Sequence, residues 1–163
     1  SPKQLGALVA TGRVTYHKDT CLDINQIKEK LALTSGNANF GLYDAYMVHA
    51  VDSLKAGSAG LSCIQGNYFP ELIVWLCNNY NNASLGSEVA LVQQFFIDQM
   101  DVMHDVYPTV AKYYLQKRGL AISTFTRRIG IGEFNAEVKT KVDRLFADYA
   151  SLKEKINIEN IMV

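Results

Sequence analysis

Cysteine, net charge and long apolar runs are all scarce in this sequence. Cys21, Cys63 and Cys77 are odd in number and show no Cys-x-x-Cys spacing, which argues against a disulfide framework and a zinc site. Lysine plus arginine and aspartate plus glutamate number 16 each, which predicts no binding to nucleic acid or an acidic membrane surface. The longest apolar run, 72–77, is far shorter than the roughly 20 residues of a membrane span, and no secretory pattern begins the chain. We therefore expect a cytoplasmic location.

What the sequence does contain is the composition of a globular protein. Its 163 residues are 48% apolar, enough for one sizeable hydrophobic core. Strand and helix patterns alternate over the first 80 residues. Strands are predicted at 13–17, 40–43 and 60–64, with a helix before the first strand and helices after Asp23, over 46–56 and from Pro70.

This βαβαβ order is typical of a parallel sheet with right-handed crossovers, in which the loops after all strands lie at one rim. We expect Lys18, Asp44 and Gln65 to share that rim. Residues 81–163 read as helical: one helix lined by Val89 to Tyr107, a second over 110–118, and a last helix capped by Asn135. The sequence thus predicts an α/β region at 1–80 and a C-terminal helical region at 81–163.

Lys18 is the residue with the clearest chemical potential. Residues 14–16 favour a strand and residues 19–20 favour a turn, so the lysine is expected at the C-terminal end of a strand, just before a helix. Catalytic groups of parallel α/β folds collect at that end of the sheet. An amine there suits a Schiff base with a carbonyl substrate. The alternative is an ordinary solvated lysine, the usual place of this residue type.

Three segments resemble motifs of one enzyme family. Lys18-Asp19-Thr20-Cys21-Leu22-Asp23 is similar to its lysine motif, Gly57–Ser62 to the glycine-rich run entering its last barrel strand, and Gly66–Leu72 to the segment after that strand. The family is the dihydrodipicolinate synthase / N-acetylneuraminate lyase superfamily of class I Schiff-base aldolases. The resemblance covers nearly the whole chain and aligns with the C-terminal half of such an enzyme.

The resemblance implies strands 6–8 of a (β/α)8 TIM barrel, followed by a C-terminal helical region. Three strands cannot close a barrel of about 250 residues, so the chain is either a small open α/β fold or part of something longer. On the family reading, strands 1–5 are missing and the fragment alone is inactive. The family further implies a lyase acting on pyruvate or a related 2-keto acid, without metal or cofactor, as a homotetramer.

The resemblance also implies the site residues. Lys18 would be the catalytic imine-forming residue, while the ends of the second and third strands would contact substrate through Tyr43, Asp44, Ala45, Ser62 and Ile64. Many family members have glycine where Ala45 stands. Asp44 has an alternative role as a cap of the following helix, and Ser62 and Ile64 as core residues of the third strand.

The Schiff-base hypothesis carries further expectations. A free lysine, with a pKa near 10.4, is protonated at neutral pH, so a nucleophilic lysine needs surroundings that favour its neutral form. We therefore expect the Lys18 amine to face inward at a barrel mouth, with His17 on the opposite strand face, toward the helices. A basic group is expected to form a solvated or intersubunit surface: Lys112, Lys117, Arg118, Arg127 and Arg128. The alternative function is a noncatalytic α/β-helical module that binds a partner and has an incidental lysine.

Overall fold

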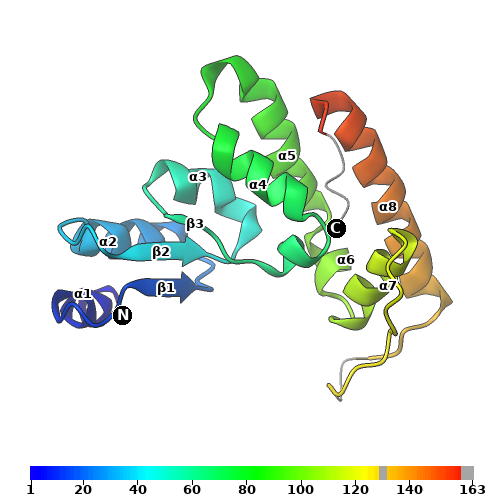
Figure 1. Cartoon of the computed structure of the whole chain (residues 1–163), viewed down its shortest axis with the longest axis horizontal. Coiled ribbons are helices and arrows are strands. Elements are labelled where there is room, and N and C mark those ends of the chain that lie inside the picture. Colours follow the sequence, from blue (N-terminus) through cyan, green and yellow to red (C-terminus); the bar gives the residue numbers. More distant parts are fainter. Residues whose placement is uncertain (129–131, 159–163) are drawn as a thin grey trace.

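The computed structural model of the chain describes residues 1–128 and 132–158. Its N-terminal part alternates helices and strands, and its C-terminal part is helical (Figure 1). The N-terminal elements are α1 (Pro2–Ala10), β1 (Tyr16–Asp19), α2 (Ile24–Thr34), β2 (Gly41–Asp44), the 3-10 helix η1 (Met47–His49), α3 (Ala50–Lys55), β3 (Gly60–Leu61), the 3-10 helix η2 (Ile64–Asn67) and α4 (Pro70–Asn79). The C-terminal elements are the 3-10 helix η3 (Ala83–Leu85), α5 (Gly86–Asp98), α6 (Met100–His104), α7 (Thr109–Lys117) and α8 (Ala136–Ile156).

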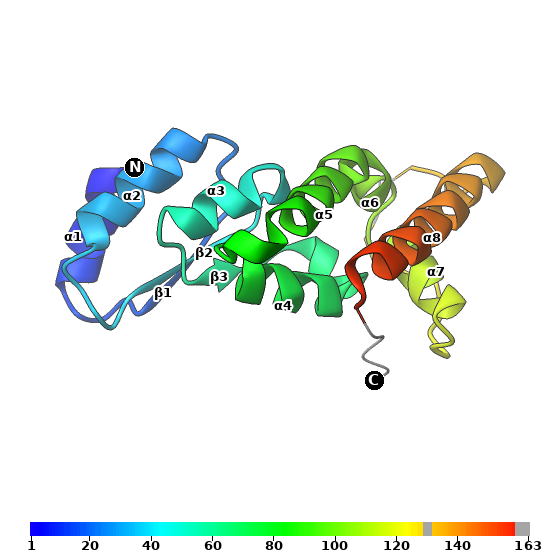
Figure 2. The same cartoon turned by 90° about the horizontal axis from the view of Figure 1, so that it is seen from above.

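The three strands form one parallel sheet in the order β1-β2-β3. Lys18 is paired with Tyr43 in the register of β1 and β2, and Tyr43 with Gly60 in that of β2 and β3. The strands therefore end at a common edge, as the alternating sequence pattern predicted. Helices α1, α2 and α3 lie on one side of this sheet (Figure 2).

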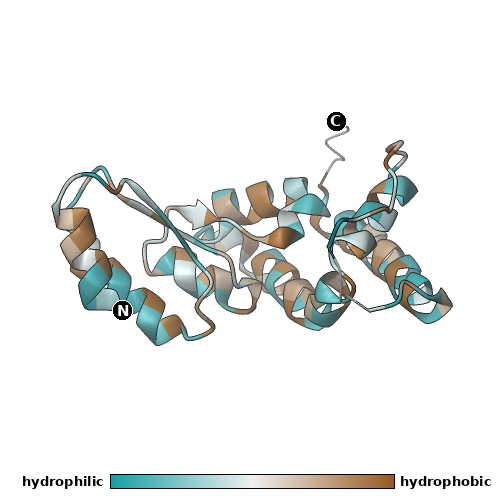
Figure 3. Ribbon diagram, turned by 90° about the horizontal axis from the view of Figure 1, so that it is seen from below, coloured by the Kyte–Doolittle hydropathy of each residue, from teal (hydrophilic) through white to brown (hydrophobic). Residues whose placement is uncertain are grey.

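Within the described residues, two hydrophobic cores hold the elements together. The smaller one joins α1 and α2 to β2 through Leu5, Val9, Ile27 and Leu42, all buried. The larger one runs from η1 to α8, so it includes residues on both sides of position 80. Its C-terminal helices carry apolar and hydrophilic surfaces side by side, as amphipathic helices do (Figure 3). Among the described residues, no helix combines the length and apolar character needed to cross a membrane.

Local sequence signals fix several helix starts. The Asp23 carboxylate accepts a hydrogen bond from the Asn25 N–H and caps α2, and the Asn135 side chain accepts one from the Val138 N–H and caps α8. Pro70 occupies the first turn of α4, where its missing N–H costs nothing. These three predicted starts are confirmed.

Other predicted boundaries are wrong. Strand β1 begins at Tyr16 instead of residue 13, and it includes Lys18. The third strand stops at Leu61, so neither Ser62 nor Ile64 lies on it. The long helix predicted to Tyr107 is divided at Gln99, whose backbone is not helical and whose side chain donates to Asp148 of α8. Tertiary contacts of this kind override local helical preference.

Candidate functional site

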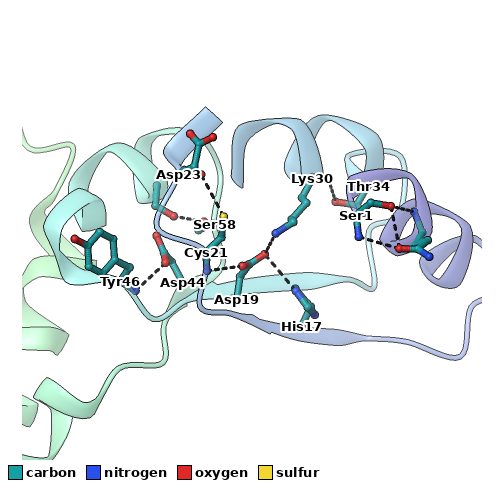
Figure 4. A network of polar contacts seen from close by, with 12 residues as sticks. Ser1, His17, Asp19, Cys21, Asp23, Lys30, Thr34, Asp44, Tyr46 and Ser58 are labelled. Carbon is teal, nitrogen blue, oxygen red and sulfur yellow. Dashed lines mark hydrogen bonds and ion pairs between the residues drawn. The ribbon is translucent and has the colours of Figure 1, made fainter. Parts of the chain in front are cut away.

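The two faces of β1 have different surroundings. Tyr16 is 70% exposed and Lys18 is exposed, whereas Asp19 is only 4% exposed. Successive strand side chains point to opposite faces, so Tyr16 and Lys18 share the face opposite to the helices. Asp19 lies on the helix side, together with His17, whose Nε2 is 3.3 Å from Asp19 Oδ2 (Figure 4). The predicted orientation of His17 is confirmed.

Tyr43 is the neighbour of Lys18 on the exposed face. Its ring is 5.9 Å from that of Tyr16, centroid to centroid. It also lies against two glycines: a Cβ on Gly60 would come within 3.1 Å of the ring, and one on Gly41 within 3.3 Å. Both distances are tighter than ordinary contact, so the glycines leave the space that the aromatic ring occupies. The result is a face formed by Tyr16, Lys18 and Tyr43, on which Lys18 and Tyr43 lie near the C-terminal edge of the sheet and Tyr16 lies at the start of β1.

The Lys18 amine is not enclosed as the Schiff-base hypothesis expects. The side chain is exposed because three strands form an open sheet, whereas a barrel interior exists only when the sheet closes on itself. Strand β1 is an edge strand, so no further strand of the described chain lies beside Lys18 on that side. Lys18 lies near the C-terminal end of its strand, as predicted. The prediction that its amine faces into an enclosed site is not met in this open sheet.

Asp19 anchors the strand that carries Lys18. Its carboxylate accepts hydrogen bonds from Lys30 Nζ of α2 at 2.6 Å and from the Cys21 N–H at 2.9 Å (Figure 4). Burial opposes the charge, but the Lys30 ammonium and the Cys21 N–H outweigh it and hold the pKa of Asp19 below its ordinary value. Because neighbouring strand residues alternate, this anchor on the helix side fixes Lys18 on the opposite side.

Asp44 also points to the helix side. It is fully buried, and its Oδ1 accepts a hydrogen bond from the Tyr46 N–H at 2.9 Å. Its Oδ2 is 3.0 Å from His49 Nε2, a distance that fits an ion pair although the angles do not make a hydrogen bond. The side chain therefore stabilises the turn into η1. This role is similar to the predicted alternative, in which Asp44 caps the following helix. A substrate contact through the main chain of Asp44 stays a prediction.

The remaining predicted contact residues follow the strands. The Ala45 N–H donates to the Asp19 carbonyl at 2.8 Å and the Ser62 N–H to the Asp44 carbonyl at 2.7 Å, so both N–H groups extend the sheet ladder. Ser62 follows Gly60, the partner of Tyr43, by two residues, and its side chain is half-buried. Ile64 is half-buried at the start of η2. Their substrate roles stay predictions.

A buried polar cluster was missed by the sequence reasoning. Glu71 of α4 is 3% exposed, and its carboxylate accepts hydrogen bonds from Tyr149 Oη at 2.5 Å and from Arg118 Nη1 at 3.3 Å. Arg118 also donates to the Tyr68 carbonyl at 2.7 Å. The prediction that Arg118 belongs to a solvated or intersubunit surface is therefore wrong. No local pattern could have paired residues 71, 118 and 149, because the contact depends on the packing of three helices.

Residues 1–128 and 132–158 contain no group of three or more histidine, cysteine or acidic side chains placed to hold a metal ion. The three cysteines are free thiols, each half-buried. Burial raises the pKa of the Cys63 and Cys77 thiols, which keeps them protonated and poorly nucleophilic at neutral pH. Lys18, in contrast to these thiols, is exposed near the C-terminal edge of the sheet, where a substrate can reach its amine.

Comparison with known proteins identifies the fold. No protein-family model and no curated protein matches the sequence. Solved structures do match, among them the 4-hydroxy-tetrahydrodipicolinate synthase of Methylacidiphilum fumariolicum SolV, with a TM-score of 0.79 and 16% identity over 96% of this chain and 51% of that one. YagE, a prophage protein of the dihydrodipicolinic acid synthase family from E. coli K12, was solved in complex with pyruvate. It matches with a TM-score of 0.77 and 18% identity over 94% of this chain and 51% of its own. Dihydrodipicolinate synthase from Thermotoga maritima matches with a TM-score of 0.75 and 21% identity over 93% of this chain and 51% of its own.

The chain thus spans about half the length of the solved structures that it matches. At these identities the likeness establishes the fold. The parallel three-stranded sheet with its helices corresponds to part of the TIM barrel of dihydrodipicolinate synthase-like proteins, and the predicted resemblance is confirmed at that level.

Proposed function

We propose that this chain supplies the C-terminal half of a class I aldolase or lyase of the dihydrodipicolinate synthase type, in which Lys18 forms a Schiff base with pyruvate or a related 2-keto acid. The observation that carries the proposal is the position of Lys18, next to last in a parallel strand and on the face opposite to the helices. When such a sheet closes into a barrel, that face becomes the interior, and that end becomes the catalytic end.

The chemistry follows from an amine held beside a keto acid. The neutral Lys18 amine attacks the keto carbon, and the resulting carbinolamine loses water to give an imine. The protonated imine withdraws electrons from the neighbouring carbon, which releases a proton and becomes the nucleophilic carbon of an enamine. Carbon–carbon bond formation or cleavage then takes place at that carbon. No metal and no cofactor enter these steps.

The other proposed contacts surround this centre. The Tyr43 ring, held by Gly41 and Gly60, forms the wall beside Lys18. Ser62 and Ile64 would contact the substrate from the third βα connection, while Asp44 and Ala45 would do so through main-chain groups. Asp44 cannot use its buried carboxylate for this purpose, since it is committed to the turn at Tyr46.

Turnover requires the remaining barrel strands, so the proposal includes a partner segment that pairs with β1. Strand β1 is an edge of the sheet. Tyr16 of this strand is 70% exposed, and Leu8 of α1 is 55% exposed. A groove of about 670 Å³ lies between α1 and β1, lined in part by Leu8, Val14 and His17. Covering this edge would bury apolar surface and enclose the Lys18 amine. The proposed assembly is a cytoplasmic homotetramer, and the chain alone is inactive.

Deuterium exchange at the pyruvate methyl group tests this function. Formation and reversal of the enamine replace methyl protons by solvent deuterons, so the assembled protein in D2O should remove the methyl proton signal of pyruvate. Lys18→Arg keeps the charge but cannot form an imine, and it should abolish the exchange. Lys28→Arg alters an exposed lysine of α2 and is the matched control, which should retain it. Equal exchange by the Lys18 and Lys28 variants would contradict the proposal.

A second candidate function is a noncatalytic interaction module. The specific observation in its favour is that the Lys18 amine is exposed on an open sheet. On this hypothesis the edge strand and the groove beside it bind a partner, and Lys18 takes no part in chemistry. The assembled protein would then leave the methyl protons of pyruvate unexchanged, while partner binding would persist in the Lys18→Arg variant.

A further inference from the structure

Two tyrosine rings lean over one glycine on the face of the sheet that carries Lys18. A Cβ on Gly41 would come within 3.3 Å of Tyr43 Cε2 and 3.5 Å of Tyr16 Cδ1. The ring centroids are 5.9 Å apart, and the ring planes are tilted by 57°. Tyr16 and Tyr43 are called the aromatic pair below. The pair covers Gly41, where a larger residue would displace both rings.

The aromatic pair covers the sheet on the N-terminal side of Lys18. Tyr16 is paired with Gly41 at the start of β1 and β2, and Lys18 is paired with Tyr43 two residues later. A strand advances about 3.3 Å per residue, so Gly41 lies roughly 6.6 Å further from the catalytic edge than Lys18 does. Inward side chains of a closed barrel are stacked in layers. The aromatic pair therefore forms the layer directly beneath Lys18.

This layer and the C-terminal edge of the sheet offer different chemistry to a ligand. The acidic side chains of β1 and β2, Asp19 and Asp44, are held on the helix side by their hydrogen bonds. The ring of Tyr16 is 70% exposed on the opposite face and offers apolar contact. The polar side chain among the proposed substrate contacts, Ser62, follows the third strand at the edge. A keto acid on Lys18 would therefore place its carboxylate toward the edge and its side chain toward the rings.

We propose that the aromatic pair limits the size of the keto acid that Lys18 accepts, with Tyr16 as a specificity-determining residue, and that the site takes 2-keto acids with a short side chain. This inference rests on the proposed Schiff-base function. The methyl group of pyruvate would contact the rings, whereas a branched side chain would collide with them. The enamine is planar, so its nucleophilic carbon stays open to a second substrate across the plane of the molecule.

A competition between two keto acids measures this size limit. Pyruvate and 4-methyl-2-oxopentanoate are added together at equal concentrations to the assembled protein, and borohydride reduction gives Lys18 adducts of different mass. The adduct ratio is taken from the excess at Lys18 over Lys28, an exposed lysine that reports the reaction of an ordinary amine and of unfolded chains. We expect the pyruvate adduct to dominate in the unmodified protein.

Tyr16→Ala removes one ring of the aromatic pair. It should shift the adduct ratio toward the larger acid by about tenfold or more, because a single methylene group changes discrimination in an apolar pocket by that order. Tyr16→Leu, a smaller cut, should shift the ratio in the same direction. Tyr16→Phe keeps the ring and should leave the ratio unchanged.

Phe125→Ala is the matched control, because Phe125 is an aromatic residue of similar exposure, 72%, in the segment after α7. It should leave the ratio unchanged. If the unmodified protein forms no adduct at Lys18 above that at Lys28, the Schiff-base function fails and this inference with it. If pyruvate modifies Lys18, the inference alone is overturned by any of three results: Tyr16→Ala keeps the original ratio, Tyr16→Phe or Phe125→Ala shifts it as much, or both shortened variants lose every Lys18 adduct.

Discussion

Lys18 and Asp19 are neighbours in sequence with opposite tasks in the structure. Asp19 ties β1 to α2 through Lys30, and strand alternation then sends Lys18 to the other face. The chemistry proposed for Lys18 therefore depends on a residue that never touches the substrate. A strand without this anchor could rotate or shift, and the amine would lose its defined direction.

Replacing Asp19 by asparagine should lower stability and change its dependence on pH. The substitution removes a buried charged hydrogen-bond partner of Lys30, and at neutral pH the free energy of unfolding should fall by about 1.5–3 kcal/mol. Asp52→Asn, at an exposed position of α3, should change it by less than about 0.5 kcal/mol. Urea unfolding of the three proteins measures both values.

The pH dependence follows from the lowered pKa of Asp19. An aspartate has an ordinary pKa of about 3.9, so in acid the unfolded chain takes up the proton first and the native state loses stability. The contribution of Asp19 is complete above about pH 5 and is lost as the pH falls through its lower folded pKa. The gap between the unmodified chain and Asp19→Asn should narrow over that interval. A gap that is constant with pH would show that the carboxylate charge is not what stabilises β1.

Two buried tyrosines offer a direct comparison. Tyr149 donates to Glu71, whereas the Tyr114 hydroxyl has no described partner. Tyr149→Phe leaves a buried carboxylate short of a donor and should cost about 1–3 kcal/mol of unfolding free energy, while Tyr114→Phe should cost nothing or increase stability. Equal losses in urea unfolding would mean that the Tyr114 hydroxyl has a partner in the native state.

At the residue scale, the sequence located Lys18 and His17 but not the buried cluster around Glu71. Successive side chains of a strand point to opposite faces, so adjacency in the sequence is enough to place Lys18 and His17 on different faces. Arg118, by contrast, follows a run of residues that also suits a solvated helix end. Its partners at 68 and 71 are about 50 positions away, and only packing brings them together.

At the element scale, helix starts were predicted better than strand ends. Caps such as Asp23 and Asn135 act through hydrogen bonds to residues two or three positions away, so the sequence contains the whole signal. Strand ends depend on the neighbouring strand. Cys63 and Ile64 are apolar enough to continue β3, yet pairing with β2 ends at Leu61, because its partner Asp44 is the last residue of β2.

The cap of α8 can be tested on its own. Asn135→Ala removes the acceptor for the Val138 N–H and should lower the free energy of unfolding by about 0.5–2 kcal/mol. Asn81→Ala, an exposed asparagine in the turn before η3, is the control and should have an effect below about 0.5 kcal/mol. If both variants unfold at the same urea concentration as the unmodified chain, the side chain of Asn135 does not hold the start of α8.

At the scale of the whole molecule, the three strands form an open sheet. The solved structures with a similar fold have chains about twice as long as this one. The sequence predicted this fold through family motifs, because the motifs occur in order along the chain. It could not predict the exposure of Lys18, since enclosure is a property of a closed barrel and not of any segment. The proposed activity is therefore a property of the assembled protein.

Borohydride trapping tests this account most directly. Pyruvate is added to the chain alone and to the chain assembled with the segment that supplies the remaining strands, each sample is reduced, and the modified lysines are located by mass spectrometry of peptides. We expect a reduced pyruvate adduct at Lys18 in the assembled protein, with Lys28 unmodified, and little or none at Lys18 in the chain alone. An assembled protein whose Lys18 stays unmodified, or is modified no more than Lys28, would contradict the Schiff-base function.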